Sequence, residues 1–131
     1  MTEQRNPYRG SPPRAWLRVH VIGVDGRASE KELLVDTGSP FTLILSTGEM
    51  QSLRQMTGTT VHTNFGVLTS GWLHVVIPEI GFDHHVFGYA SDEVVAAAQS
   101  SSPAFQGLAG LPLLRMMQYG GDATSFWLRP Q

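Results

Sequence analysis

The stretch LLVDTGSP, residues 33–40, decides the fold of this chain. Its three leading apolar residues predict a strand buried on both faces. Gly38 and Pro40 predict a tight loop directly after that strand. Asp36 is therefore expected at the end of a core strand, where a buried carboxylate is costly unless neighbouring hydroxyls and backbone amides satisfy it. The simpler interpretation is an Asx-type turn in which Asp36 caps its own loop.

The composition limits the classes of protein to which the chain can belong. Its 131 residues predict one domain with a sizeable core. A net charge of −2 and a charged fraction of 15% give no basic face, which argues against nucleic acid as a partner. The absence of cysteine removes disulfides, thiol nucleophiles and cysteine-based metal sites. This pattern is typical of a reducing cytoplasm, which is the expected location.

The N-terminal segment differs in composition from the rest of the chain. Residues 1–13 are polar and rich in proline, and they predict a flexible N-terminal arm. This segment is unlike a signal or transit peptide, and no apolar run approaches the length of a membrane span. Residues 14–131 are expected to form the single domain.

Short β-rich runs separated by glycine and proline predict a mostly β chain. In the first run, Leu17, Val19 and Val21 alternate with more polar residues, so they are expected to point to one face. Asp25-Gly26 then opens a hairpin turn. Strands are expected over Ala15–Val24, Glu30–Val35, Phe41–Leu45, His84–Tyr89 and Ser125–Arg129.

Short helices are expected between the strands. Ser46 and Glu49 have the spacing of a capping box and predict a helix to about Met56. Two further helices are expected from Ser91 to Gln99 and from Pro112 to the Gly120-Gly121 pair. Between Thr59 and Ile77, β-rich runs on either side of two glycines predict a long hairpin.

A second informative stretch is GLAGLPLL, residues 107–114. An apolar strand ends at Gly110, and a helix begins with Pro112 near its first position.

The order of these elements resembles that of retropepsin-like aspartic proteases, the single-domain branch of the pepsin-like fold. The resemblance runs from about Ala15 to Leu128 and is carried by two anchors, residues 34–39 and residues 108–110. Because Ser39 follows the Asp-Thr-Gly, the bacterial-type members are the most similar. The resemblance implies an all-β fold with one to three short helices, a closed acid-protease barrel with one lobe per chain, and a homodimer.

The resemblance also implies an endopeptidase that needs no cofactor and no metal. Two carboxylates sharing one proton would activate water, since like charges about 3 Å apart cannot both ionise. This chain has one Asp-Thr-Gly, and its other acids do not repeat the pattern. The second carboxylate would therefore be Asp36 of an identical chain, across a two-fold axis.

Other roles follow from the same resemblance. Thr37 would bond across the axis, the Gly38 amide would donate to Asp36, and Ser39 would steady its outer oxygen. The partners would be a second copy and an extended peptide, with no nucleic acid or membrane. The supporting residues would be Leu108, Ala109 and Gly110. A flap over the substrate would comprise Thr63, Asn64, Phe65, Gly66, Val67 and Leu68, and Phe126–Leu128 would join the dimer interface.

Three alternatives stay open. Pro40 after the Ser and the small Ala109 depart from the family pattern, which leaves a catalytically weak or inactive dimer that binds peptides or a partner. A non-catalytic β-domain with an accidental Asp-Thr-Gly is the second. The third is a metal site, although adjacent histidines on a strand point to opposite faces. Its candidate ligands are His62, His74, Asp83, His84 and His85.

Overall fold

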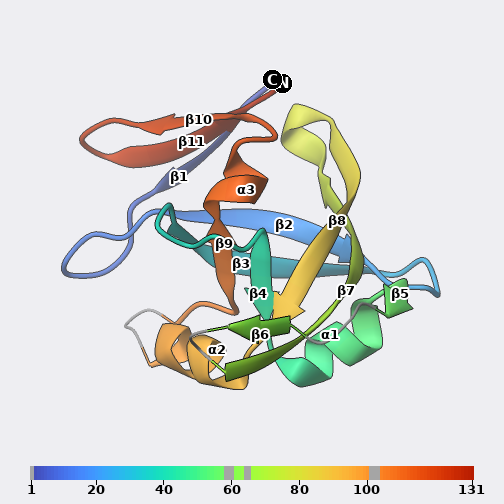
Figure 1. Ribbon diagram of the computed structural model, residues 1–131. Helices are drawn as coiled ribbons and strands as arrows, with labels where there is room; N and C mark the ends of the chain where they lie inside the picture. The colour runs from blue at the N-terminus through green and yellow to red at the C-terminus, as the bar shows by residue number, and fades with distance from the viewer. Residues whose placement is uncertain (1, 58–60, 64–65, 101–103) are drawn as a thin grey trace.

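Figure 1 shows the computed structural model, in which β-strands wrap around a core and short helices lie around them. The structure describes residues 2–57, 61–63, 66–100 and 104–131, and for residues 56–57, 61–63 and 66–68 it describes the backbone alone. The main sheet closes on itself because its first strand also pairs with one near its end. This confirms the expected mostly β, closed-barrel fold with one lobe per chain.

The barrel strands follow one another in space in an order that differs from their order in the chain. Two short strands, β5 (Met56–Thr57) and β6 (Val61–Thr63), pair with β7 outside the ring. Around the ring the strands are β2 (Trp16–Ile22), β3 (Ala28–Asp36), β9 (Leu108–Gly110), β4 (Leu43–Leu45), β8 (Phe82–Ala90) and β7 (Gly66–Ile77).

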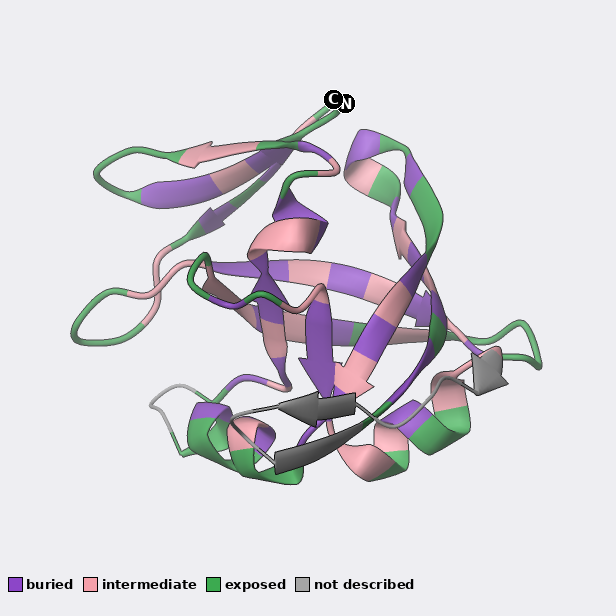
Figure 2. Cartoon of the chain, viewed as in Figure 1, coloured by how far each residue is buried: buried purple, intermediate pink, exposed green. Residues whose placement is uncertain are grey.

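The alternation predicted for the first strand is confirmed. Leu17, Val19 and Val21 on β2 are fully buried, and Leu17 lies opposite the buried Leu33 of β3. Figure 2 shows the resulting bands of buried residues, which alternate with more exposed ones along the barrel strands. Burial of these aliphatic side chains stabilises the pairing of β2 with β3 and so helps to hold Asp36, the last residue of β3, in place.

The N-cap predicted at Ser46 is confirmed, and the helix expected from Ser91 is capped by that serine. Helix α1 (Thr47–Leu53) follows Ser46, whose hydroxyl accepts from the Glu49 amide at 3.2 Å, and it ends earlier than expected. Helix α2 (Asp92–Gln99) follows Ser91, whose hydroxyl accepts from the Val94 amide at 3.3 Å. A single 3-10 turn, η1 (Pro78–Ile80), links β7 to β8.

Residues 4–7 differ from the flexible arm expected at the N-terminus. They form β1 (Gln4–Pro7), which pairs antiparallel with β11 (Ser125–Arg129). The physical reason is that the side-chain amide of Gln4 replaces a missing strand neighbour. It donates to the Arg18 carbonyl oxygen at 2.9 Å and accepts from the Arg18 amide at 2.8 Å, so a polar side chain is buried with its hydrogen bonds made.

The helix that begins near Pro112 is shorter than predicted. Helix α3 (Leu111–Leu114) ends well before Gly120-Gly121, and these glycines belong to a strand, β10 (Gln118–Gly121), that pairs with β11. The Trp127 ring lies against Gly120, where an added Cβ would come within 2.5 Å of it. The glycine pair therefore marks a close approach to an aromatic ring and does not stop a helix.

The strand β11 has the bounds predicted for it, and it pairs on both sides, with β1 and with β10. Phe126 and Leu128 are buried in the core of their own chain. A contribution of residues 126–128 to a dimer interface stays a prediction, and in this structure the backbone hydrogen bonds of β11 are made within the chain. In the described ranges, none of the helices has the length and apolar character needed to cross a membrane.

Candidate active site

Asp36 is the last residue of β3 and lies at the edge of the barrel. Strand β3 runs parallel to β9, with Leu34 opposite Leu108 and Asp36 opposite Gly110. The two sequence anchors are therefore neighbours in space. Strand β3 pairs with β2 over residues 28–34 and with β9 over residues 34–36, so the backbone that carries Asp36 is held by neighbouring strands and is rigid.

The loop after Asp36 is fixed by hydrogen bonds at both of its ends. The Gly38 amide donates to Asp36 Oδ1 at 3.0 Å, and the Ser39 amide donates to the Asp36 carbonyl oxygen at 3.1 Å. The Leu111 amide donates to the Ser39 carbonyl oxygen at 3.2 Å. Thr37 lies between these anchored points and is exposed.

Ser39 has a different contact from the one that the resemblance implied. Its hydroxyl oxygen accepts from the Phe41 amide at 3.3 Å, and the residue is buried. Within the described part of the chain, the hydrogen bond to the Asp36 carboxylate comes from the Gly38 amide. In this structure Ser39 therefore shapes the loop and does not touch the carboxylate.

Gly110 explains how β9 can lie so close to the loop. A Cβ added at this position would lie 1.8 Å from the Phe41 carbonyl oxygen and 3.0 Å from the Ser39 carbonyl oxygen. The Gly110 amide in turn donates to the Thr42 carbonyl oxygen at 2.9 Å. Only glycine permits this approach of two backbones, so Gly110 supports the Asp36 loop directly.

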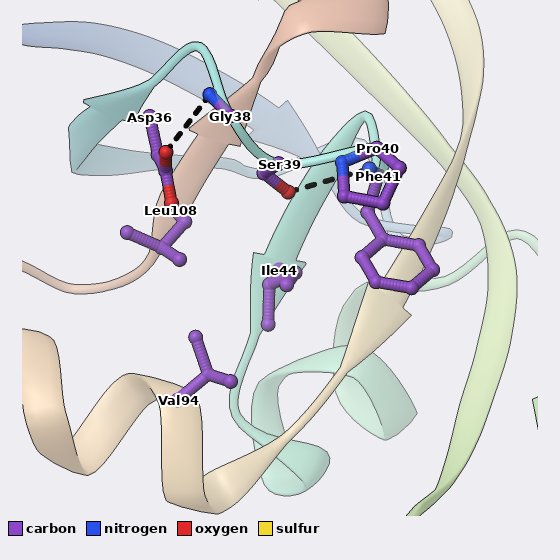
Figure 3. Close-up of a pocket in the computed structure, with 8 residues that line it drawn as sticks. All are labelled: Asp36, Gly38, Ser39, Pro40, Phe41, Ile44, Val94 and Leu108. Atoms are coloured by element: carbon purple, nitrogen blue, oxygen red, sulfur yellow. Dashed lines mark hydrogen bonds between the residues drawn. The ribbon is translucent and has the colours of Figure 1, made fainter. Parts of the chain in front are cut away.

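A cavity of about 180 Å³ opens beside Asp36. Figure 3 shows the side chains of Ile44, Val94 and Leu108 converging on it, with Phe41 on the side away from Asp36. These residues come from β4, α2, β9 and the loop. The cavity combines apolar walls with one carboxylate, which is the usual character of a ligand site.

Sequence reasoning found the carboxylate of this cavity and missed three of its walls. Phe41 and Ile44 were assigned to a plain strand, and Val94 to a helix of no special role. The buried Ala98 lies one turn after Val94 on α2. That spacing indicates an apolar helix face, but a sequence alone does not show which strand the face covers.

A second hollow, of about 430 Å³, lies on the other side of the loop. It shares Gly38, Ser39 and Pro40 with the first, and Thr37 also lines it. Its remaining walls come from the segment around α3, namely Leu111, Pro112 and Arg115. The loop that carries Asp36 therefore has accessible surface on both sides.

The predicted flap lies largely outside what the structure describes. Asn64 and Phe65 are outside the described residues, and for Thr63, Gly66, Val67 and Leu68 only the backbone is described. The backbone of Thr63 pairs with Gly66, which places both on the hairpin formed by β6 and β7. The role of this segment stays a prediction.

Among the described residues that line the cavity, Asp36 is the one acid. Asp83 and Asp92 are engaged elsewhere, with His74 Nε2 at 2.5 Å and with the Thr47 amide at 2.8 Å. A second carboxylate for the site would therefore have to come from outside this chain.

Those histidines considered as metal ligands whose side chains the structure describes do not form a common site. His85 stacks on His74 with a centroid separation of 4.8 Å, whereas His84 lies against Phe82. Among the residues whose side chains the structure describes, no group of three or more histidine, aspartate or glutamate side chains could hold a metal ion. His62 lies outside those side chains.

Comparison with known proteins gives one structural match. No protein-family model and no curated protein sequence matches the chain. Among solved structures, the chain is similar to the crystal structure of a retropepsin-like aspartic protease from Rickettsia conorii, with a TM-score of 0.59 and 17% sequence identity. The match covers 98% of this chain and 93% of that chain. At this identity the likeness shows the fold, and the chemistry has to be argued from the residues of the site.

Proposed function

For a chain that has a retropepsin-like fold, we propose the function of an aspartic endopeptidase formed by two identical chains. Each chain supplies Asp36, and the two carboxylates meet at a two-fold axis. The observation that carries the proposal is the placement of Asp36. It ends a rigid core strand, accepts from the Gly38 amide, and is the one acid among the described residues that line an apolar cavity.

The chemistry needs no metal and no nucleophilic side chain. One Asp36 is ionised and takes a proton from a water molecule, whose oxygen attacks the carbonyl carbon of the peptide bond. The other Asp36 is protonated and donates its proton to the carbonyl oxygen, which gives a tetrahedral diol. The C–N bond then breaks as the leaving nitrogen receives a proton, and the pair of carboxyls again holds one proton between them.

The residues around Asp36 have supporting roles in this proposal. The Gly38 amide orients the carboxylate, and the exposed Thr37 is placed to meet its counterpart in the second chain. Ser39 and the segment Leu108–Gly110 fix the position of the loop relative to the barrel strands. Hydrogen bonds from backbone groups suit this task because they add no titrating group to the site.

A second candidate is a dimer that binds peptides without cleaving them. The apolar walls of the cavity favour it, because they are suited to bind a side chain whether or not a second carboxylate is present. The two candidates differ in turnover, not in binding. Mass spectrometry of a peptide mixture incubated with the protein therefore separates them.

The test compares the wild type with Asp36→Asn. If the proposal holds, the wild type cleaves peptides, and the variant loses about 10²–10⁴-fold in kcat because general acid–base catalysis is removed. The control is Asp83→Asn, since Asp83 is exposed on β8 and outside the cavity, and it is expected to keep wild-type activity. Cleavage that survives in Asp36→Asn would contradict the proposal, and folded wild type that binds peptides without cleaving them would favour the second candidate.

A further inference from the structure

Phe41 forms one wall of the cavity beside Asp36, but it belongs to a loop. The backbone bends at residues 40–42, and β4 begins only at Leu43. The backbone of this loop is fixed by Gly110, whose amide donates to Thr42. That contact fixes the main chain, and the aromatic ring of Phe41 needs a support of its own.

Tyr89 supplies that support from a rigid strand. The ring centroids of Phe41 and Tyr89 are 4.6 Å apart, with an angle of 57° between the ring planes. Tyr89 lies on β8 and is paired on both sides, with Ser70 of β7 and with Ile44 of β4. Tilted rings at this separation attract one another, so the Tyr89 ring fixes the position of the Phe41 ring.

Further rings behind Tyr89 extend the support. Phe87 contacts Tyr89 with centroids 5.6 Å apart, and Trp72 on β7 contacts Phe87 with centroids 5.2 Å apart. The Thr42 hydroxyl also donates to the Phe87 carbonyl oxygen. We call the four rings Trp72, Phe87, Tyr89 and Phe41 the aromatic row. It runs over the outer face of β7 and β8 and ends at the cavity beside Asp36.

We propose that Tyr89 is a positioning residue for this cavity, because it holds the Phe41 ring where the ring sets the size of the side chain that the cavity accepts. The selection of side-chain size rests on the proposed function, whereas the hold of Tyr89 on the Phe41 ring does not. Without the Tyr89 ring, the Phe41 ring can turn away, the cavity widens, and the preference between large and small apolar side chains shifts toward the large ones.

The first measurement follows the Phe41 ring directly. 4-Fluorophenylalanine is placed at position 41 alone, and its fluorine resonance is recorded by NMR. We expect the resonance of the otherwise wild-type chain to be displaced from that of the free amino acid by its neighbouring ring. Tyr89→Ala should lose most of this displacement, whereas Tyr89→Phe, which keeps the ring, should retain it. Tyr119→Ala is the matched control, because Tyr119 contacts Phe126 in the terminal sheet.

The second measurement follows specificity. Two peptides that differ only in a Phe or an Ala beside the cleaved bond are compared. In Tyr89→Ala the ratio of their kcat/KM values should change about tenfold in favour of Phe, mainly through KM. The separate variant Tyr89→Phe, which keeps the ring, should have the wild-type ratio, and Tyr119→Ala should also leave the ratio unchanged. Tyr89→Leu provides a less disruptive substitution if circular dichroism shows that Tyr89→Ala does not fold.

The two measurements separate the possible failures. An unchanged fluorine resonance in a folded Tyr89→Ala or Tyr89→Leu chain overturns the positioning role, whatever the activity. A shifted resonance with an unchanged specificity ratio overturns the claim about side-chain size. If the wild type cleaves no peptide, the proposed function fails, and the fluorine measurement still decides whether Tyr89 places Phe41.

Discussion

Replacing Gly110 with alanine should destabilise the fold at the place where the two sequence anchors meet. The added Cβ would lie 1.8 Å from the Phe41 carbonyl oxygen, and the contacted atom is backbone, which cannot turn aside. Moving the backbone at Gly110 away from the backbone of residues 39–42 by more than an ångström breaks the hydrogen bonds from the Gly110 amide to Thr42 and from the Leu111 amide to Ser39. Two such bonds contribute about 1 kcal/mol each, and overpacking adds about 1–3 kcal/mol. The expected loss in the free energy of unfolding is therefore about 3–5 kcal/mol.

Urea unfolding followed by tryptophan fluorescence measures this loss. With a slope of about 1–3 kcal/mol per molar urea, the midpoint should fall by about 1–5 M. Gly48→Ala is the matched control, because a Cβ at this helical position meets nothing within 4 Å. It should stabilise the protein by about 0.5–1 kcal/mol. If Gly110→Ala unfolds at the wild-type midpoint, the close approach described for Gly110 is wrong.

Two further predictions concern charged groups. The pKa of Asp122 is lowered mainly by backbone amides that donate to its carboxylate, and the pKa of Glu32 is lowered mainly by an arginine that forms two hydrogen bonds with it. Their stabilisation is fully present above about pH 5 and is lost as the pH falls through their lowered pKa values, so the melting temperature should fall on acidification, and less so in Asp122→Asn. Lys31 is buried and paired with Glu49 of α1, so Lys31→Met should cost about 3–5 kcal/mol in urea unfolding. Adding Glu49→Leu should recover part of that loss, and a purely additive double variant would contradict the pairing.

Local sequence patterns predicted those parts of the fold that local chemistry determines. Strand β3 is apolar over the three residues before Asp36, and Ser46 caps the helix that follows it with its own hydroxyl. Each of these features depends on a few neighbouring residues. The pattern of an apolar strand that ends at Gly110 before a helix is also local, so this segment was recognised from the sequence. Why a glycine is needed there, namely the close approach of the Phe41 carbonyl oxygen, was visible only in the structure.

Features that depend on distant residues were missed. Gln4 and Asn6 are polar, and they are buried only because their amides bond to the backbone of β2 and to each other. Gly120 resembles a helix stop until Trp127 is placed against it. Val94 and Phe41 line the cavity because α2 and the loop come together in space, and no spacing along the chain indicates this.

The central claim is that two Asp36 carboxylates form one catalytic unit, and mixed dimers test it most directly. Wild-type and Asp36→Asn chains are mixed in known ratios under conditions in which chains exchange, and peptide cleavage is measured after equilibration. If one chain's Asp36 cannot act without the other's, activity follows the square of the wild-type fraction, so an equal mixture keeps about a quarter of the activity. If each chain acts by itself, the equal mixture keeps about half, and the shared pair is contradicted.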